Sequence, residues 1–156
     1  MIRAATPSDV PVILGFIRDL AAFEREPDAE KATEASLHAA LFGDRPAAEA
    51  VIAEDGAPLG FALFFHNFST WTGKRGLYLE DLYVTPATRG RGVGTALLRH
   101  LAGIAVDRDC GRFEWSVLDW NADAIAFYRA MGAVGQEEWT VQRVEGVALA
   151  RLAGRD

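Results

Sequence analysis

Residues 77–94 read LYLEDLYVTPATRGRGVG and contain two patterns, one after the other. The first, Leu77–Val84, is rich in apolar and aromatic residues and predicts a β-strand that carries two acids, Glu80 and Asp81. A glycine-rich segment follows and leads into a predicted helix over 91–108. That helix has apolar residues on one face: Val93, Leu97, Leu101 and Ile104. We therefore expect a strand, a glycine-rich turn and a long amphipathic helix in this order.

Three glycines, Gly90, Gly92 and Gly94, lie at the start of that helix, and this position is typical of a phosphate site. Glycines let backbone N–H groups approach an anion closely, and the N-terminus of a helix adds a partial positive charge. Arg89 and Arg91 add full charges beside them. A flexible glycine-rich turn is the alternative, but the place before a helix favours a diphosphate site.

Two other phosphate-binding motifs do not fit this segment. A Walker A loop needs a lysine, and none follows Gly94. A dinucleotide-binding fingerprint needs a third glycine where the chain has Leu97, although Asp119 lies at about the right distance for a ribose-binding acid. In addition, five residues (Thr85–Arg89) separate the strand from the first glycine, and a hairpin precedes that strand. We therefore reject a Rossmann-type unit.

The rest of the chain predicts further helices and strands. Before residue 77 we expect, in order, a strand (2–5), a helix capped by Thr6, a second helix (33–42) and a hairpin (50–65). After residue 108 we expect a strand (112–118), a helix (121–131) and a last strand (138–144). The hairpin turn, Asp55-Gly56, is typical of type I′ geometry. The apolar stretch 147–152 packs either on a neighbouring molecule or on its own sheet. This order predicts a single mixed α/β domain over 1–156.

The amino-acid composition argues against several classes of function. The chain has 156 residues, 50% of them hydrophobic, with a formal net charge of −6, which argues against a nucleic-acid partner and favours a cationic one. A single cysteine, Cys110, excludes an intrachain disulfide, and the three histidines have no metal-ligand spacing, so we expect no metal. The longest uncharged stretch, 56–73, is too polar to span a bilayer. We expect a cytoplasmic protein that binds neither membranes nor nucleic acids.

The pattern Arg89-x-x-Gly92-x-Gly94, after a strand with Glu80 and Asp81, resembles the acetyl-CoA signature of the GNAT superfamily of N-acetyltransferases. The likeness runs from Ile2 to about Leu152. Three segments are similar to the diamine/polyamine branch, which includes the spermidine/spermine-type and thialysine-type enzymes: 77–84, 119–121 and 127–133. The resemblance implies an α/β (α+β type) fold with a mixed, mostly antiparallel central sheet flanked by helices. It also implies a splayed strand pair at the cofactor cleft, and a homodimer.

The resemblance implies acetyl-CoA as cofactor and coenzyme A as product. The backbone amides of 89–94 would hold the diphosphate, and the pantetheine arm would lie against the end of the strand at 82–84. Asn121 would contact that arm, and Tyr128 would lie near the thiol. The residues implied in cofactor binding are Leu82, Tyr83, Val84, Arg89, Gly90, Arg91, Gly92, Val93, Gly94, Thr95, Asn121 and Tyr128.

Acetyl transfer to an amine requires that the amine lose a proton and that the leaving thiolate be stabilised or protonated, and residues of this chain can serve both needs. An aliphatic amine has a pKa near ~10 and is protonated at neutral pH, and the departing thiolate must be stabilised. By the resemblance, Glu80 takes the amine proton and Tyr128 protonates the sulfur, with direct attack on the thioester. Each residue also has a structural explanation. Tyr128 belongs to an apolar helical stripe, Asn121 can be an N-cap, and one of the adjacent acids Glu80 and Asp81 can simply face solvent.

Acids beside aromatic rings point to a cationic acceptor, because such groups attract an ammonium ion through charge and cation–π interaction. The residues implied in substrate binding are Phe23, Glu24, Glu80, Asp81, Glu138 and Trp139. We expect the acceptor to be a primary amine of a small molecule: a diamine, a polyamine or a lysine-like amino acid. Two alternatives stay open. The acceptor is a protein lysine or N-terminus, or the chain is a non-catalytic acyl-CoA-binding regulatory module.

Overall fold

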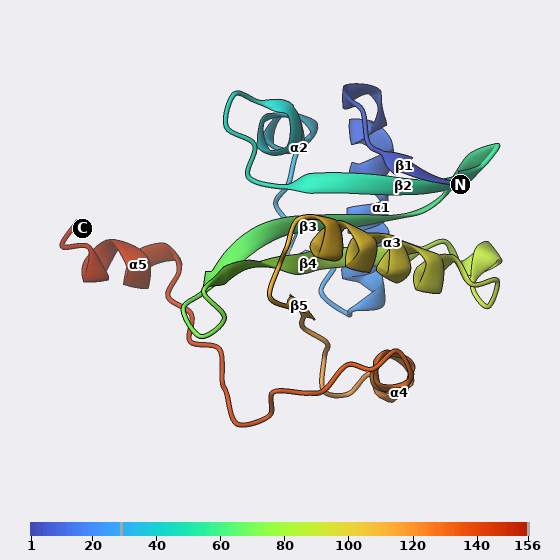
Figure 1. The fold of residues 1–156 in the computed structure, drawn as a ribbon. Helices are drawn as coiled ribbons and strands as arrows, with labels where there is room; N and C mark the ends of the chain where they lie inside the picture. The colour runs from blue at the N-terminus through green and yellow to red at the C-terminus, as the bar shows by residue number, and fades with distance from the viewer. Residues whose placement is uncertain (29, 156) are drawn as a thin grey trace. The chain divides into compact units, whose positions relative to one another are not determined.

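The structure is a computed structural model that describes residues 1–28 and 30–155. It divides into an N-terminal unit, Met1–Ser116, and a C-terminal unit, Val117–Asp156. The N-terminal unit contains a five-stranded sheet in the order β1-β2-β3-β4-β5 (Figure 1). Its strands are β1 (Ile2–Ala4), β2 (Glu49–Asp55), β3 (Ala57–Ser69), β4 (Lys74–Val84) and β5 (Phe113–Trp115). Neighbours pair antiparallel except β5, which runs parallel to β4. The expected mixed, mostly antiparallel sheet is confirmed.

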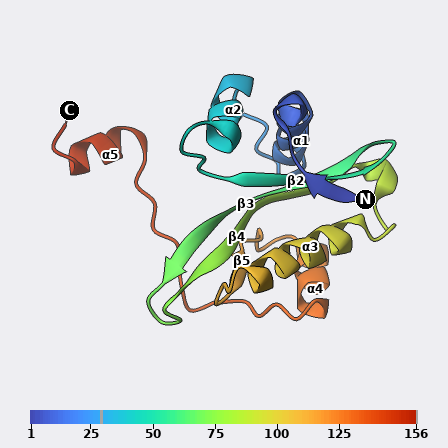
Figure 2. The same cartoon turned by 45° about the horizontal axis from the view of Figure 1, so that its top comes forward.

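Helices cover both faces of this sheet, as Figure 2 shows. On one face lie α1 (Val10–Phe23), which follows a 3₁₀ turn at Pro7–Asp9, and α2 (Glu34–Phe42). The opposite face carries α3 (Val93–Asp107). The core on the side of α1 and α2 is built from buried apolar side chains of both layers: Val10, Ile13, Leu14, Phe16, Leu37, Leu41, Ala50, Ile52, Phe61, Leu63 and Tyr83. Of the apolar face predicted for α3, Leu97 and Leu101 are buried and Val93 and Ile104 are half-buried, while Leu98 and Ala105 are buried as well.

The hairpin of β2 and β3 is confirmed, but the predicted turn type is wrong. A type I′ turn needs positive φ at both central residues. Gly56 has φ of 74°, whereas Asp55 is not among the described residues with positive φ. The strands also extend beyond the predicted range, since β3 continues to Ser69.

A β-bulge interrupts the pairing of β3 with β4. Leu79 lies opposite Phe64 and Asp81 lies opposite Leu63, so Glu80 is the extra residue. Because Phe64 and Leu63 face opposite sides of the sheet, so do Leu79 and Asp81. Leu63 belongs to the core beneath α1, which puts Asp81 on the α1 side. The strand is therefore not regular at this point, and of the two adjacent acids Glu80 is the exposed one.

The expected splayed strand pair is formed by β4 and β5. They pair only over Leu77–Leu79 and Phe113–Trp115, while β4 continues to Val84. Within 1–28 and 30–155, no residue of the sheet pairs with 80–84 on that side. This edge of β4 therefore keeps backbone N–H and C=O groups available.

The C-terminal unit contains two helices, α4 (Ala122–Ala130) and α5 (Gly146–Leu152). The predicted strand over 138–144 is wrong: those residues are irregular. A strand needs a neighbour for its backbone hydrogen bonds, and this unit has no other strand among its described residues. The stretch at 147–152, expected to pack on a neighbour or on a sheet, is helical because alanine, leucine and arginine are good helix formers.

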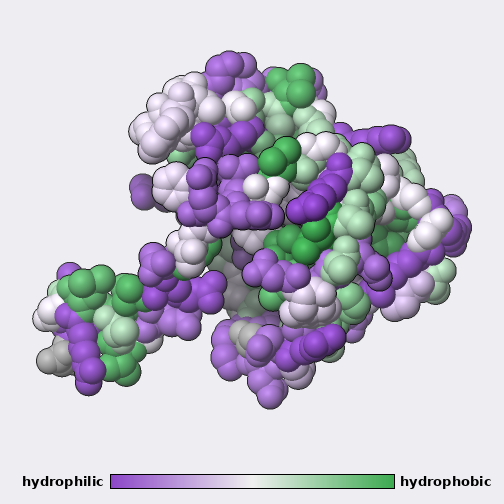
Figure 3. All heavy atoms as spheres, turned by 90° about the horizontal axis from the view of Figure 1, so that it is seen from below, coloured by the Kyte–Doolittle hydropathy of each residue, from purple (hydrophilic) through white to green (hydrophobic). Residues whose placement is uncertain are grey.

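Many apolar side chains of the C-terminal unit are exposed. None of its described residues is buried. Figure 3 shows apolar side chains of α5, at the left of the view, open to solvent. The exposed apolar residues of this unit include Val134, Trp139, Val141, Val147, Leu149 and Leu152.

No helix in the described part of the chain is long and apolar enough to cross a membrane.

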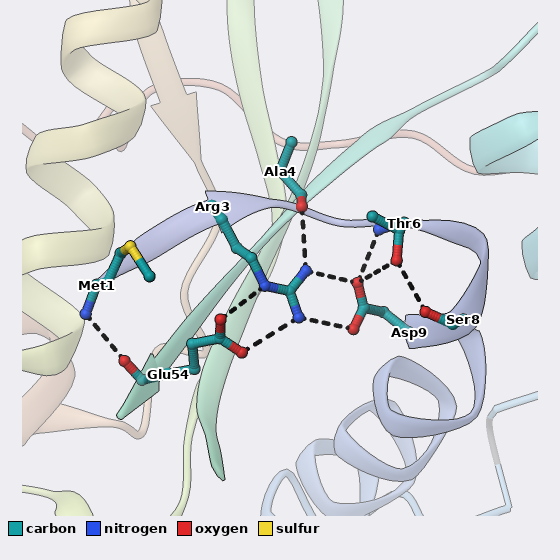
Figure 4. Close-up of polar contacts among 7 residues, drawn as sticks. All are labelled: Met1, Arg3, Ala4, Thr6, Ser8, Asp9 and Glu54. Carbon is teal, nitrogen blue, oxygen red and sulfur yellow. Dashed lines mark hydrogen bonds and ion pairs between the residues drawn. The ribbon is translucent and has the colours of Figure 1, made fainter. Parts of the chain in front are cut away.

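Arg3 fastens the first strand to its neighbours (Figure 4). Its guanidinium donates to both oxygens of Asp9, at 2.8 and 2.9 Å, and to both oxygens of Glu54, at 2.8 and 3.2 Å. Asp9 also accepts from the backbone N–H of Thr6 at 2.7 Å. The hydrogen bonds from Arg3 are the main reason that the pKa of Asp9 falls to about 2. One arginine therefore joins β1, β2 and the start of α1.

We predict that Asp9→Asn lowers the free energy of unfolding by about 1–2 kcal/mol at neutral pH. Asparagine still accepts the hydrogen bond from Thr6 but loses the ion pair. Since the pKa of Asp9 lies below its ordinary value of 3.8, the ion pair stabilises the fold above about pH 4, and this contribution is lost as the pH falls towards 2. Urea unfolding at pH 7 and near pH 2.5 measures both effects. Asp55→Asn, at the exposed end of β2, is the control. Equal stability of wild type and Asp9→Asn at pH 7 would contradict the role given to this pair.

Candidate functional site

The segment Arg89–Gly94, hereafter the glycine loop, joins β4 to α3 as predicted. A 3₁₀ turn at Pro86–Thr88 leads into it from the end of β4. Gly90 and Gly92 both have φ of 80°, a conformation that side chains with a Cβ atom rarely adopt. Gly92 is the N-cap of α3 in the left-handed region. Glycine is thus required here by backbone conformation.

This loop ends in an anion-binding geometry. The N–H of Ala96 donates to the carbonyl of Gly92 at 2.9 Å. The preceding amides at 93–95 come before the helical ladder and have no carbonyl partner within the helix. Together with the positive end of the helix dipole, they form a site suited to a phosphate group.

Beside the loop lies an open depression that sequence reasoning missed. Its lining includes two residues predicted for the cofactor, Gly92 and Thr95. The other lining residues are Met1, Ile2, Ala96, Arg99 and His100. The sequence spacing shows that Ala96, Arg99 and His100 share one helix face. Nothing in the sequence places Met1 and Ile2 beside that face, so the depression could not be predicted.

Three carboxylates form an acid cluster, defined as Glu24, Glu80 and Asp81. Glu24 is the C-cap of α1, and the two others lie at the bulge of β4. Burial, followed by the negative charges of Glu80 and Glu24, raises the pKa of Asp81 to about 6. Burial also raises the pKa of Glu24. Because the charges of Glu80 and Glu24 both act on Asp81, three of the residues predicted for amine binding lie in one region of the structure.

Aromatic rings lie next to this cluster. Phe23, the last residue of α1, is 48% exposed, and Tyr83 on β4 is buried. The guanidinium carbon of Arg89 lies 5.3 Å from the ring centroid of Phe23 and 5.7 Å from that of Tyr83. Its Nε donates to the carbonyl of Val84 at 3.1 Å. The side chain of Arg89 therefore lies against aromatic rings, although Arg89, like Arg91, is an exposed residue.

The other predicted site residues belong to the C-terminal unit. Asn121 is the N-cap of α4, because its Oδ1 accepts from the N–H of Ala124 at 3.2 Å. Tyr128 lies on the same helix, partly buried, with its ring 5.4 Å from that of Phe127. Glu138 and Trp139 are exposed in an irregular segment. The capping role expected for Asn121 is thus confirmed.

The N-terminal unit therefore combines three chemical features along one strand and its continuation. The acid cluster lies at the bulge, the unpaired edge of 80–84 follows, and the glycine loop comes after the strand end. Such a set can bind an anion at one end, hydrogen-bond an extended ligand with amide groups along the edge, and hold a cation at the carboxylates.

Comparison with known proteins agrees with these features. The model of the acetyltransferase (GNAT) family matches residues 14–133. A thialysine N-epsilon-acetyltransferase from Sus scrofa is 39% identical over 99% of this chain and 98% of its own length. An L-ornithine N5-acetyltransferase from Arabidopsis thaliana is 33% identical over 95% of this chain and 85% of its own. These relatives confirm the resemblance to the branch that includes thialysine-type enzymes.

A solved structure also matches along nearly the whole chain. An integron cassette protein from the mobile metagenome of V. cholerae superposes with a TM-score of 0.82 and 28% identity, covering 98% of this chain and 96% of that one. The family match, the two relatives and the glycine loop before α3 lead to the same conclusion. The chain belongs to the acetyltransferase (GNAT) family.

Proposed function

We propose that this protein is an acetyl-CoA-dependent N-acetyltransferase that modifies a primary amine of a small cationic molecule. The observation that carries the proposal is that one strand connects both parts of the site. β4 bears two acids of the acid cluster, and a 3₁₀ turn joins its end to the glycine loop at the start of α3. The names of the relatives, which mention thialysine and ornithine, support an amine of the diamine, polyamine or lysine-like class.

The residues present fit coenzyme A. The amides at 93–95, held open by the positive φ of Gly92, would bind the diphosphate, with Arg91 beside them. The unpaired edge of β4 at Leu82–Val84 would accept the pantetheine arm, whose amides match free strand groups. When bound, acetyl-CoA supplies the thioester carbonyl that the amine attacks.

The acid cluster would bind and deprotonate the amine. A charged ammonium is attracted to Asp81 and Glu24, and the ring of Phe23 adds cation–π attraction. Glu80, the exposed bulge residue, would then take the proton from the amine nitrogen, so that a neutral nucleophile forms. Tyr128 would donate a proton from its hydroxyl to the departing sulfur, while Asn121 would contact the cofactor arm.

The remaining parts of the proposal concern the state of the whole protein. The family match at 14–133 crosses the boundary between the two units, which supports a single domain over 1–156. The exposed apolar residues of the C-terminal unit support a homodimer. The acidic charge of −6 and the lone cysteine support a cytoplasmic enzyme without a nucleic-acid partner.

We predict that the purified protein releases coenzyme A thiol when it receives acetyl-CoA and diamines, polyamines or lysine analogues. Glu80→Gln and Tyr128→Phe should each lower kcat by about 10²-fold, because proton transfer by a positioned group is worth that much. Neither should weaken coenzyme A binding by more than about threefold. Asp107→Asn and Tyr78→Phe are the matched controls, with expected activity near wild type.

Three outcomes of this assay would contradict the proposal. If no amine of the panel leads to release of coenzyme A thiol, the proposed enzymatic reaction is excluded. Coenzyme A binding without transfer would indicate a non-catalytic module. Acetylation of peptide amines alone would exclude the small-molecule substrate. Full kcat in either variant would remove that residue from the mechanism.

We predict that kcat/KM for the amine falls as the pH drops through about 6, because Asp81 then takes up a proton and stops attracting the ammonium group. Asp81→Asn should lower kcat/KM by about tenfold or more near neutral pH and abolish the acidic limb of the pH profile, which is the fall of kcat/KM near pH 6. Glu24→Gln should move the limb to lower pH, since one repelling charge is gone. A limb that is unchanged in Asp81→Asn would contradict the assignment.

Unfolding measurements give an independent check on Asp81. Its folded pKa lies above its ordinary value of 3.8, so ionisation of Asp81 costs stability as the pH rises from about 4 to above 6. Asp81→Asn should therefore raise the free energy of unfolding by about 1–3 kcal/mol near pH 8 and give no gain near pH 3.

A further inference from the structure

Arg89 is the first residue of the glycine loop, yet its side chain contacts groups outside that loop. The Nε donates to the carbonyl of Val84, and the guanidinium carbon lies 5.3 Å from the Phe23 ring and 5.7 Å from the Tyr83 ring. All three partners lie at the ends of elements, Val84 and Tyr83 at the end of β4 and Phe23 at the end of α1.

The Tyr83 side of this contact is rigid. Tyr83 packs against Phe16 with centroids 5.5 Å apart, and Phe16 stacks on Phe61 at 5.7 Å. These three rings are buried, with exposed fractions of 8% or less. Tyr83 therefore gives Arg89 a fixed platform that continues into the core.

The Phe23 side of the contact is more exposed. Phe23 is 48% exposed, and it directly precedes Glu24, the C-cap of α1. A guanidinium is attracted to the face of an aromatic ring, and here the guanidinium of Arg89, an exposed residue, lies against both rings. Arg89 is thus placed to fix the end of α1 against the end of β4.

We infer that Arg89 is a positioning residue for the amine substrate, which fixes the Phe23-Glu24 end of α1 so that Glu24 stands beside Asp81. This inference rests on the proposed function. It gives the two arginines of the loop different tasks: Arg89 orders the acceptor side, whereas Arg91, which is exposed, adds charge beside the diphosphate. The backbone of Arg89 can still serve the cofactor, because only its side chain is committed.

The test compares Arg89→Gln with Arg91→Gln, since both remove one positive charge from the same loop. Arg89→Gln should raise the KM for the amine about fivefold, and change kcat and the Kd for coenzyme A by less than about twofold. Arg91→Gln should do the reverse, weakening coenzyme A and leaving the amine KM close to wild type. Arg89→Lys should restore only part of the loss, because an ammonium lacks the planar stacking surface.

A double-mutant cycle isolates the contact itself. Phe23→Leu keeps an apolar side chain but removes the ring, and it should raise the amine KM by a similar factor. Because the two residues act through one contact, the double variant Arg89→Gln/Phe23→Leu should raise the amine KM by no more than about the larger of the two single-variant effects. Thermal unfolding of every variant confirms that the fold is retained.

The results separate this inference from the proposed function. If wild type binds no coenzyme A, the proposed function fails together with the inference. If wild type transfers acetyl groups but Arg89→Gln weakens coenzyme A as much as it raises the amine KM, the inference alone fails. Fully additive effects of Arg89→Gln and Phe23→Leu on the amine KM would also overturn it.

Discussion

The backbone N–H groups at the first turn of α3 are the feature on which the functional interpretation depends. They have no carbonyl partners inside the helix, and Gly92 in the left-handed region leaves them open at the end of the loop. An array of this kind is electrostatically complete only with an anion or solvent bound to it. The sheet, the two helical layers and the core hold this loop next to a strand end, and every chemical role proposed for β4 follows from that placement.

The bulge at Glu80 is the second constraint, because it decides on which face of the sheet the carboxylate of Asp81 lies. It leaves Asp81 on the α1 side, where Glu24 and burial disfavour its ionised form. Folding therefore retains a group that opposes stability at neutral pH, as is typical of functional sites. Arg89 contacts the same region, since its guanidinium carbon lies 5.3 Å from the ring centroid of Phe23, the residue before Glu24. The site is thus a junction between the end of α1 and the end of β4.

Much of the fold could be predicted from the sequence, because the deciding patterns are local. The strand at 77–84, the glycines before α3 and the cap at Asn121 depend on residues within one or two turns of each other. The bulge could not be predicted, since it depends on the register against Phe64 on another strand. The strand expected at 138–144 failed for the same reason: its apolar and β-branched residues have the propensity but lack a pairing partner within their own unit. Likewise, the position of the Arg89 side chain depends on rings distant in sequence.

The central claim is that the glycine loop binds the diphosphate of coenzyme A, and titration calorimetry tests it most directly. Folded wild-type protein should bind coenzyme A but bind pantetheine, which lacks the diphosphate and the 3′-phosphoadenosine attached to it, at least about tenfold more weakly. Gly92→Val, which forces a branched side chain into a positive φ, should weaken coenzyme A by about tenfold or more and leave pantetheine unchanged. Absence of coenzyme A binding by folded protein, or equal affinity for the two ligands, would contradict the account.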